Sequence, residues 1–104
     1  MIDWLVYLSK RAETDLDQIY EYIAITLLEP EIASKQISRI RDAIIKLDHF
    51  PERCPLFGRE PWRSQGLRHL VIDNYLAVFT VDEERKSVII LTIVYAKRNL
   101  QDLL

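Results

Sequence analysis

Arginine and lysine side chains gather in two short stretches, one near the middle of the chain and one near its end. Four arginines stand against two acids between His49 and His69, and a further Lys-Arg pair follows the last apolar run. Guanidinium groups that converge would bind phosphates through paired hydrogen bonds and would stabilise charge on a phosphorus oxygen. The alternative is that these side chains are solvated or paired with nearby acids. The basic candidates for a phosphate or nucleic-acid site are Arg59, Arg63, Arg68, Lys97 and Arg98.

Two other side chains near those arginines have groups suited to proton transfer. His69 titrates near neutrality and is a candidate general acid or base. Strand alternation places it on the opposite sheet face from Arg68, which favours a packing role. Tyr95 ends the last apolar run, and its hydroxyl could act on a leaving group only if neighbouring cations lowered its pKa from about 10. The catalytic candidates are therefore Arg68, His69, Tyr95 and Arg98.

The chain lacks the residue patterns of common nucleotide, nucleophile and metal sites. Cys54 is the one cysteine and cannot form an internal disulfide, and with two histidines it cannot complete a closed zinc site. The acids of the first predicted helix are expected on a solvent face, and His49 is expected to complement a helix C-terminus. We therefore expect no metal ion and no cofactor.

Length and composition indicate one globular domain spanning residues 1–104. The chain is 49% hydrophobic and 29% charged, which is too apolar for a disordered protein. Its net charge of −2 is not that of a general nucleic-acid binder. Its apolar runs are too short to cross a bilayer, and its start does not have the pattern of an export signal. These features predict a cytoplasmic protein that does not interact with membranes.

Two apolar stripes with helical spacing follow a first predicted strand, Asp3–Leu8. Ser9 is a suitable N-cap for the first helix, and Pro30 suits the first turn of the second. The first stripe comprises Ala12, Leu16, Ile19, Ile23 and Leu27. The second stripe comprises Ala33, Ile37, Ile40, Ile44 and Leu47. Because the connection is very short, these helices should form an antiparallel hairpin that ends at Phe50-Pro51.

The apolar period changes from that of a helix to that of a strand after an irregular segment, residues 51–66. Strands are predicted over Leu67–Ile72, Tyr75–Val81 and Ser87–Tyr95, with a tight turn at Asp73-Asn74. The last strand is apolar on both faces, which predicts a central position in the sheet. The predicted fold is α+β with the order β-α-α-β-β-β, a helical hairpin packed on an antiparallel sheet of three or four strands.

Together, these residues resemble the RelE/ParE toxin superfamily over nearly the whole chain. The motifs occur in the order and spacing expected of that superfamily, and the series as a whole is more specific than any one piece. The series comprises Ala12-x-x-Asp15-Leu16-x-x-Ile19-Tyr20-x-Tyr22-Ile23, Ala33, Leu47-x-x-Phe50-Pro51, Gly66-x-Arg68-x-Leu70, Asn74-Tyr75-x-x-x-Phe79-x-Val81-Asp82, Val88–Ile93, Tyr95-x-x-Arg98-Asn99 and a leucine-rich end.

The resemblance implies a type II toxin neutralised by a cognate antitoxin, whose C-terminal segment would wrap the toxin by helix-in-groove and strand-addition contacts. An acidic segment of that partner would neutralise a basic groove near the sheet.

Members of the superfamily either cleave mRNA on the ribosome without a metal or poison DNA gyrase. Arg68, Tyr95 and Arg98 fall on motif positions of the cleaving members. However, Leu76 stands where those members often have a basic residue, and Tyr95 stands where many have histidine. The long helical hairpin and the modest acidity favour the gyrase-directed members. Either target, or an inactive relative that only binds an antitoxin, is compatible with the residues.

Overall fold

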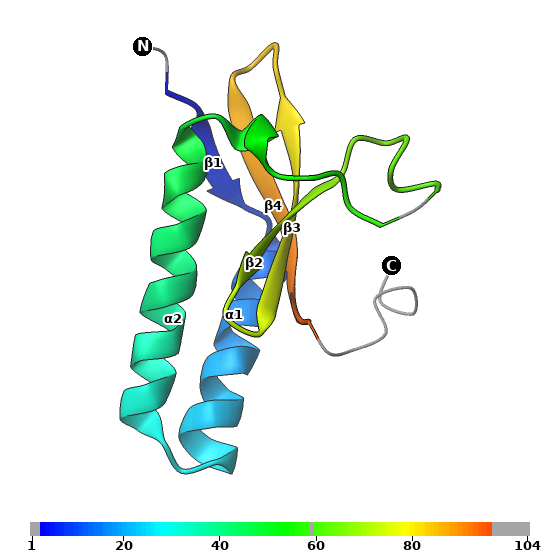
Figure 1. The fold of residues 1–104 in the computed structure, drawn as a ribbon. Coiled ribbons are helices and arrows are strands. Elements are labelled where there is room, and N and C mark those ends of the chain that lie inside the picture. Colours follow the sequence, from blue (N-terminus) through cyan, green and yellow to red (C-terminus); the bar gives the residue numbers. More distant parts are fainter. Residues whose placement is uncertain (1–2, 59, 97–104) are drawn as a thin grey trace.

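The computed structural model describes residues 3–58 and 60–96, and it shows two helices covering one face of a four-stranded sheet (Figure 1). The predicted order of elements is confirmed. Each predicted strand is present, and the two helices are joined at one end by a short connection. The elements are β1 (Leu5–Leu8), α1 (Lys10–Glu21), α2 (Pro30–Ile45), β2 (Arg68–Ile72), β3 (Tyr75–Asp82) and β4 (Ser87–Tyr95).

The sheet has the strand order β1-β4-β3-β2, so β4 is an interior strand, as its apolar faces predicted. Neighbouring strands β2, β3 and β4 are antiparallel. In contrast, β1 is parallel to β4, with Leu5 opposite Ser87 and Leu8 opposite Ile90. The sheet is therefore mixed and not purely antiparallel. A parallel pair requires a long crossover connection, which the helical hairpin and the β2–β3 hairpin supply.

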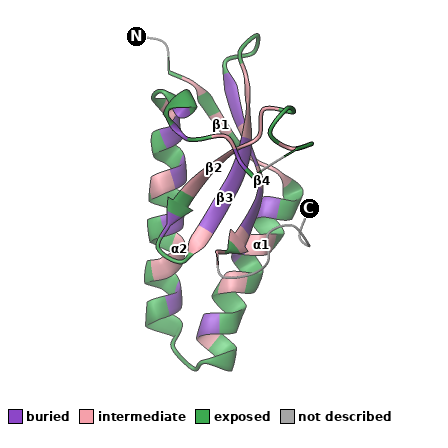
Figure 2. Cartoon of the chain, turned by 45° about the vertical axis from the view of Figure 1, so that its right-hand side comes forward, coloured by how far each residue is buried: buried purple, intermediate pink, exposed green. Residues whose placement is uncertain are grey.

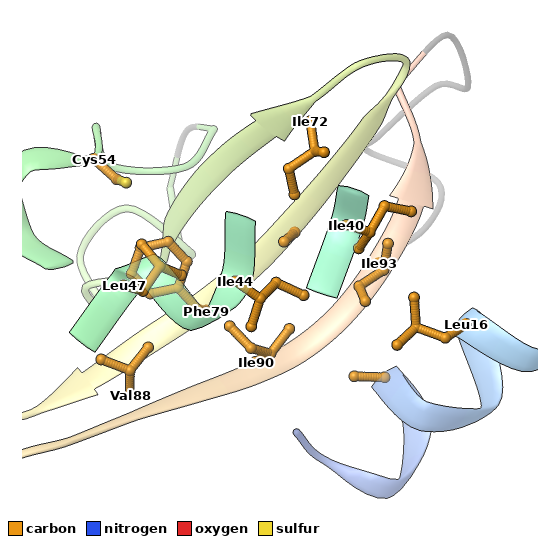
Figure 3. Packing of buried hydrophobic residues seen from close by; sticks show 12 residues of the cluster. Leu16, Ile40, Ile44, Leu47, Cys54, Ile72, Phe79, Val88, Ile90 and Ile93 are labelled. Carbon is orange, nitrogen blue, oxygen red and sulfur yellow. The ribbon is translucent and has the colours of Figure 1, made fainter. Parts of the chain in front are cut away.

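The core lies between the helical hairpin and the sheet (Figure 3). Members of both predicted helical stripes point into it, and every core side chain named below is at most 2% exposed. Removal of these apolar side chains from water holds the two layers together. The fully buried members include Leu16, Ile40, Ile44, Leu47, Phe79 and Ile90.

Both helices begin as their sequences predicted. The Oγ of Ser9 accepts a hydrogen bond from the Ala12 N–H at 3.0 Å and donates one to the Leu91 carbonyl at 2.8 Å. Ser9 therefore caps α1 and also ties it to β4. Pro30 occupies the first turn of α2, where its missing N–H is not needed. None of the helices in the described part of the chain combines the length and the apolar character that a bilayer span requires.

Asp15 corrects the expectation that every acid of α1 faces solvent. Its Oδ2 accepts hydrogen bonds from the Thr92 hydroxyl at 2.6 Å and from the Ile93 N–H at 3.0 Å. Strand β1 ends opposite Ile90, so the edge of β4 beyond that point has no strand partner on this side. The Asp15 carboxylate supplies the missing acceptor, because a buried backbone N–H without a partner is costly.

Candidate functional site

Arg68 begins β2 and lies beside the segment that follows the helical hairpin. Its backbone forms an isolated antiparallel bridge with Leu56. Its Nη1 donates hydrogen bonds to the carbonyl oxygens of Cys54, at 2.6 Å, and Glu52, at 3.2 Å. Hydrogen bonds from a charged donor are stronger than neutral ones. They fix the 3₁₀ turn Pro51–Arg53 against the start of the strand, so Arg68 holds this loop in place.

Tyr95 lies at one end of the sheet, well away from Arg68. It pairs with Tyr75 of β3, and the two rings meet edge to face with their centroids 5.6 Å apart. Burial raises the pKa of the Tyr75 hydroxyl, and the nearby Tyr95 and Tyr22 hydroxyls raise it further. Arg68 pairs with Phe79, four positions further along β3, a distance of about 13 Å along the strand. The structure therefore does not bring Arg68 and Tyr95 together.

His69 lies on the sheet face that points away from the helices. It is paired with Val78, and its ring meets Phe57 edge to face with the centroids 5.7 Å apart. Its Nδ1 is buried and has no hydrogen-bond partner among the described residues. Burial lowers the pKa of this imidazole below its ordinary value of 6.5. The surroundings favour a neutral ring that packs against Phe57.

This burial of His69 predicts a pH-dependent stability. The unfolded chain binds a proton at His69 more readily than the folded chain does, because the folded-state pKa is lower. The free energy of unfolding should therefore fall as the pH drops below 6.5 and should level off below the folded-state pKa. His69→Phe should flatten this dependence, which urea titrations between about pH 5 and about pH 7 would measure. A slope unchanged by His69→Phe but removed by the exposed control His49→Gln would contradict the assignment.

The irregular segment places its aromatic residues over the same sheet face. Phe57 is buried with Leu76 and Val78, and Trp62 packs against this group. Both aromatic rings therefore cover this face of the sheet. Arg63 is exposed in the turn that follows. Three further basic candidates, Arg59, Lys97 and Arg98, lie outside the described residues.

The described residues contain one group that resembles a metal-ligand set. Asp3, Asp48 and His49 present their ligand atoms within 4.8 Å of one another. The Nδ1 of His49 is 3.2 Å from the Asp3 carboxylate and 3.4 Å from that of Asp48. All three side chains are at least one-third exposed. His49 follows the 3₁₀ turn at the end of α2, near the helix C-terminus that it was expected to complement. In its protonated form it also pairs with both acids.

A shallow groove of about 460 Å³ runs between α2 and β2. It is open to solvent. Its walls come from the second half of α2 and the residue after it, from Arg53 in the following 3₁₀ turn, and from the edge strand β2 with the turn that follows it. Both charged and apolar side chains face it. The lining residues are Arg39, Asp42, Ala43, Lys46, Arg53, Leu70, Val71, Ile72 and Asp73.

An ion pair closes one end of this groove. The Arg39 guanidinium donates to both carboxylate oxygens of Asp73, at 2.8 and 2.7 Å, and Gln36 donates to the same carboxylate at 3.0 Å. The hydrogen bond from Arg39 is the main cause of a lowered pKa for Asp73, and the pKa of Arg39 is raised in return. The negative charge of Asp73 is therefore neutralised by Arg39 of the same chain.

Among the other charged side chains of the groove, the positive ones outnumber the negative ones. Lys46 makes no ion pair with another described residue, and the Arg53 guanidinium donates to the carbonyls of His49 and Phe50. With Arg39 and Asp73 paired, two cations remain against the single carboxylate of Asp42. The groove therefore favours an anionic ligand.

Strand β2 also offers free backbone groups at this groove. Ile72 and Tyr75 flank a two-residue turn, so they form the hydrogen-bonded pair that closes the hairpin. Alternation then directs the N–H and C=O of Val71 away from β3, and the Val71 side chain is 60% exposed. His69 has the same orientation, and its N–H already donates to the Pro55 carbonyl. An extended peptide can therefore pair with the edge of β2 around Val71.

Residues 6–100 match the family described as the ParE toxin of a type II toxin-antitoxin system, parDE. The chain belongs to the ParE toxin family. A search of curated proteins finds no match. The family therefore rests on the match over most of the chain and on the fold.

Solved structures share the ParE fold seen here. A chain of the chromosomal ParDE system from P. aeruginosa is 25% identical, with a TM-score of 0.76, and the match covers 93% of this chain and 100% of that one. A chain of the RelBE2 toxin-antitoxin complex from Mycobacterium tuberculosis is 21% identical, with a TM-score of 0.65 and coverages of 93% and 97%. A chain of the archaeal RelE-RelB complex from Pyrococcus horikoshii is 16% identical, with a TM-score of 0.60 and coverages of 95% and 100%.

The groove residues of this ParE-family chain were not among the predicted site residues. Arg39 lies in α2 and Lys46 directly follows it, seven positions further on, which places both on the same side of the helix. That spacing is visible in the sequence. What it does not show is that this side of α2 lies next to the free edge of β2.

Proposed function

We propose that this chain is a growth-arresting toxin that a neighbouring antitoxin neutralises, and that its cytoplasmic target is DNA gyrase. The observation that carries the choice of target is the position of Arg68. Its guanidinium is bonded to two main-chain carbonyls, and it lies far along the sheet from Tyr95. A nuclease that works without a metal needs its charged and proton-transferring groups around one phosphate. Membership of the ParE family and the net charge of −2 support the same choice.

The groove between α2 and β2 is the proposed antitoxin site. An extended antitoxin segment would pair with the backbone of Val71, and its acidic side chains would face Lys46 and Arg53. Two of the similar structures belong to toxin-antitoxin systems, which supports a partner of this kind for this chain. Because the groove is open, such a segment needs no prior rearrangement of the toxin.

The target is tested with the purified chain and with induced cells. We expect the chain to inhibit plasmid supercoiling by gyrase. Supercoiling should stay normal when the antitoxin is added before the chain. Primer extension on cellular mRNA after induction should show no new cleavage sites. The matched control is the chain added together with the antitoxin, which should leave both growth and supercoiling unchanged.

Two outcomes would replace this proposal. New mRNA ends that depend on the ribosome, with normal supercoiling, would show a cleaving toxin. Normal growth after induction, with the chain folded and bound to its antitoxin, would show a regulatory or inactive relative.

A further inference from the structure

The end of the helical hairpin carries an exposed apolar surface. We call residues 20–32 the hairpin tip. It projects beyond the β2–β3 turn (Figure 1), and nearly all of it is exposed (Figure 2). Six large apolar side chains are at least 39% exposed there, which is unusual for a surface that has no partner. They are Tyr20, Tyr22, Ile25, Leu27, Leu28 and Ile32.

Local backbone geometry explains why the sequence pattern missed this surface. A π-helical turn, Tyr22–Thr26, follows α1, and the Leu27 N–H donates to the Tyr22 carbonyl at 3.0 Å. The extra residue in this turn shifts the positions after it around the helix axis. Leu27 was predicted to be the last residue of the buried stripe, but it is 50% exposed.

Leu28 is the least expected residue of the hairpin tip. Its φ is +57°, a left-handed conformation that disfavours any residue with a Cβ and that glycine normally occupies at a helix end. Its side chain is nevertheless 79% exposed, so packing within the chain does not explain a leucine here. Strained residues of this kind are concentrated at binding surfaces, where the strain serves another contact.

The charges around the hairpin tip indicate what it can bind. No lysine or arginine occurs between Arg11 and Lys35. The exposed acids Glu21, Glu29 and Glu31 lie among the six apolar side chains. Two such tips would repel each other, so a second copy of the chain is disfavoured. An acidic antitoxin segment is disfavoured for the same reason.

We propose that the hairpin tip docks a basic amphipathic helix of another protein. The apolar stripe of that helix would cover Leu28 and its neighbours, and lysines or arginines beside the stripe would face the three acids. This surface is opposite in charge to the groove between α2 and β2, so the two sites accept different partners. The inference is independent of the proposed target and of the antitoxin.

The test uses the full-length chain, a helical peptide probe and a matched pair of variants. The probe has a leucine stripe flanked by lysines, and a counter-probe has glutamates in their place. Leu28→Gly removes the exposed side chain and relieves the left-handed backbone. Phe50→Gly does the same at the other end of α2, since Phe50 has a φ of +46° and is 71% exposed.

Leu28→Gly should weaken binding of the lysine probe about tenfold or more. Phe50→Gly should leave that binding unchanged. Both variants should raise the melting temperature by about 4 °C or more, because glycine accepts the left-handed conformation without strain. A loss of binding combined with a gain of stability is not the result of a structural defect. The double variant Glu29→Gln with Glu31→Gln removes charge alone. It should weaken binding of the lysine probe and strengthen binding of the glutamate probe.

Four results would overturn the proposal. The first two are unchanged binding of the lysine probe in Leu28→Gly, and a loss of that binding in Phe50→Gly as large as in Leu28→Gly. The third is equal affinity of the original chain for the two probes. The fourth is a dimer of the original chain in analytical ultracentrifugation that Leu28→Gly dissociates. The last would assign the tip to a second copy of the chain. Fluorescence anisotropy measures the affinities, and thermal denaturation of the same samples reports their stability.

Discussion

Lys46→Glu is expected to weaken binding of the antitoxin to this chain by about a hundredfold. Arg39 and Asp73 neutralise each other in an ion pair, so the remaining charges of the groove are the cations Lys46 and Arg53 and the carboxylate of Asp42. The substitution leaves one cation against two acids, so an acidic antitoxin segment would meet like charges. Like-charge contacts at an interface cost several kcal/mol, and a hundredfold change corresponds to about 2.7 kcal/mol. Isothermal titration at low and high salt measures the affinity and how far it is screened.

Lys35→Glu is the matched control for this experiment. Lys35 is exposed on α2, the helix that ends next to Lys46, but it does not line the groove, and its reversal changes the net charge equally. Val71→Pro is a second variant that removes the free N–H at the edge of β2 without changing charge. Equal weakening by Lys35→Glu and Lys46→Glu would show a general charge effect and would remove the groove from the antitoxin interface. Unchanged binding in Val71→Pro would rule out strand pairing at Val71.

Local signals predicted most of the fold. Ser9 and Pro30 mark the helix starts because capping and the missing proline N–H act within one turn of the chain. The change from helical to alternating apolar spacing located all three C-terminal strands. The interior position of β4 followed from its apolar character on both faces. Each of these features is signalled by residues that lie close together in the sequence.

The parts that were not predicted depend on contacts between distant segments. The helical pattern places Asp15 among exposed acids, whereas its carboxylate accepts the Ile93 N–H of β4 beyond the point where β1 ends. That end point is a property of the sheet and leaves no mark near residue 15. The groove likewise exists only because α2 and β2 lie side by side. The separation of Arg68 from Tyr95 follows from strand direction and register, which set how residues from different strands meet.

The Asp15 carboxylate is expected to matter more for stability than any other surface acid of α1. Asp15→Ala should lower the free energy of unfolding by about 2–4 kcal/mol, because it leaves the Ile93 N–H and the Thr92 hydroxyl without their acceptor. Domains of this size are stable by only about 5–15 kcal/mol, so this loss is a large fraction of the total. Urea denaturation measures it directly.

Three variants separate the hydrogen bonds of Asp15 from its charge. Asp17→Ala removes the same charge from an exposed position of α1 and should change stability by less than about 0.5 kcal/mol. Asp15→Asn keeps an oxygen that can accept both hydrogen bonds, so it should lose less stability than Asp15→Ala. Thr92→Val removes one donor, and in its background Asp15→Ala should cost less than it does in the original chain. If Asp15→Ala and Asp17→Ala are equally mild, the edge of β4 does not depend on this carboxylate, and the link between α1 and the sheet rests on Ser9 and the apolar core.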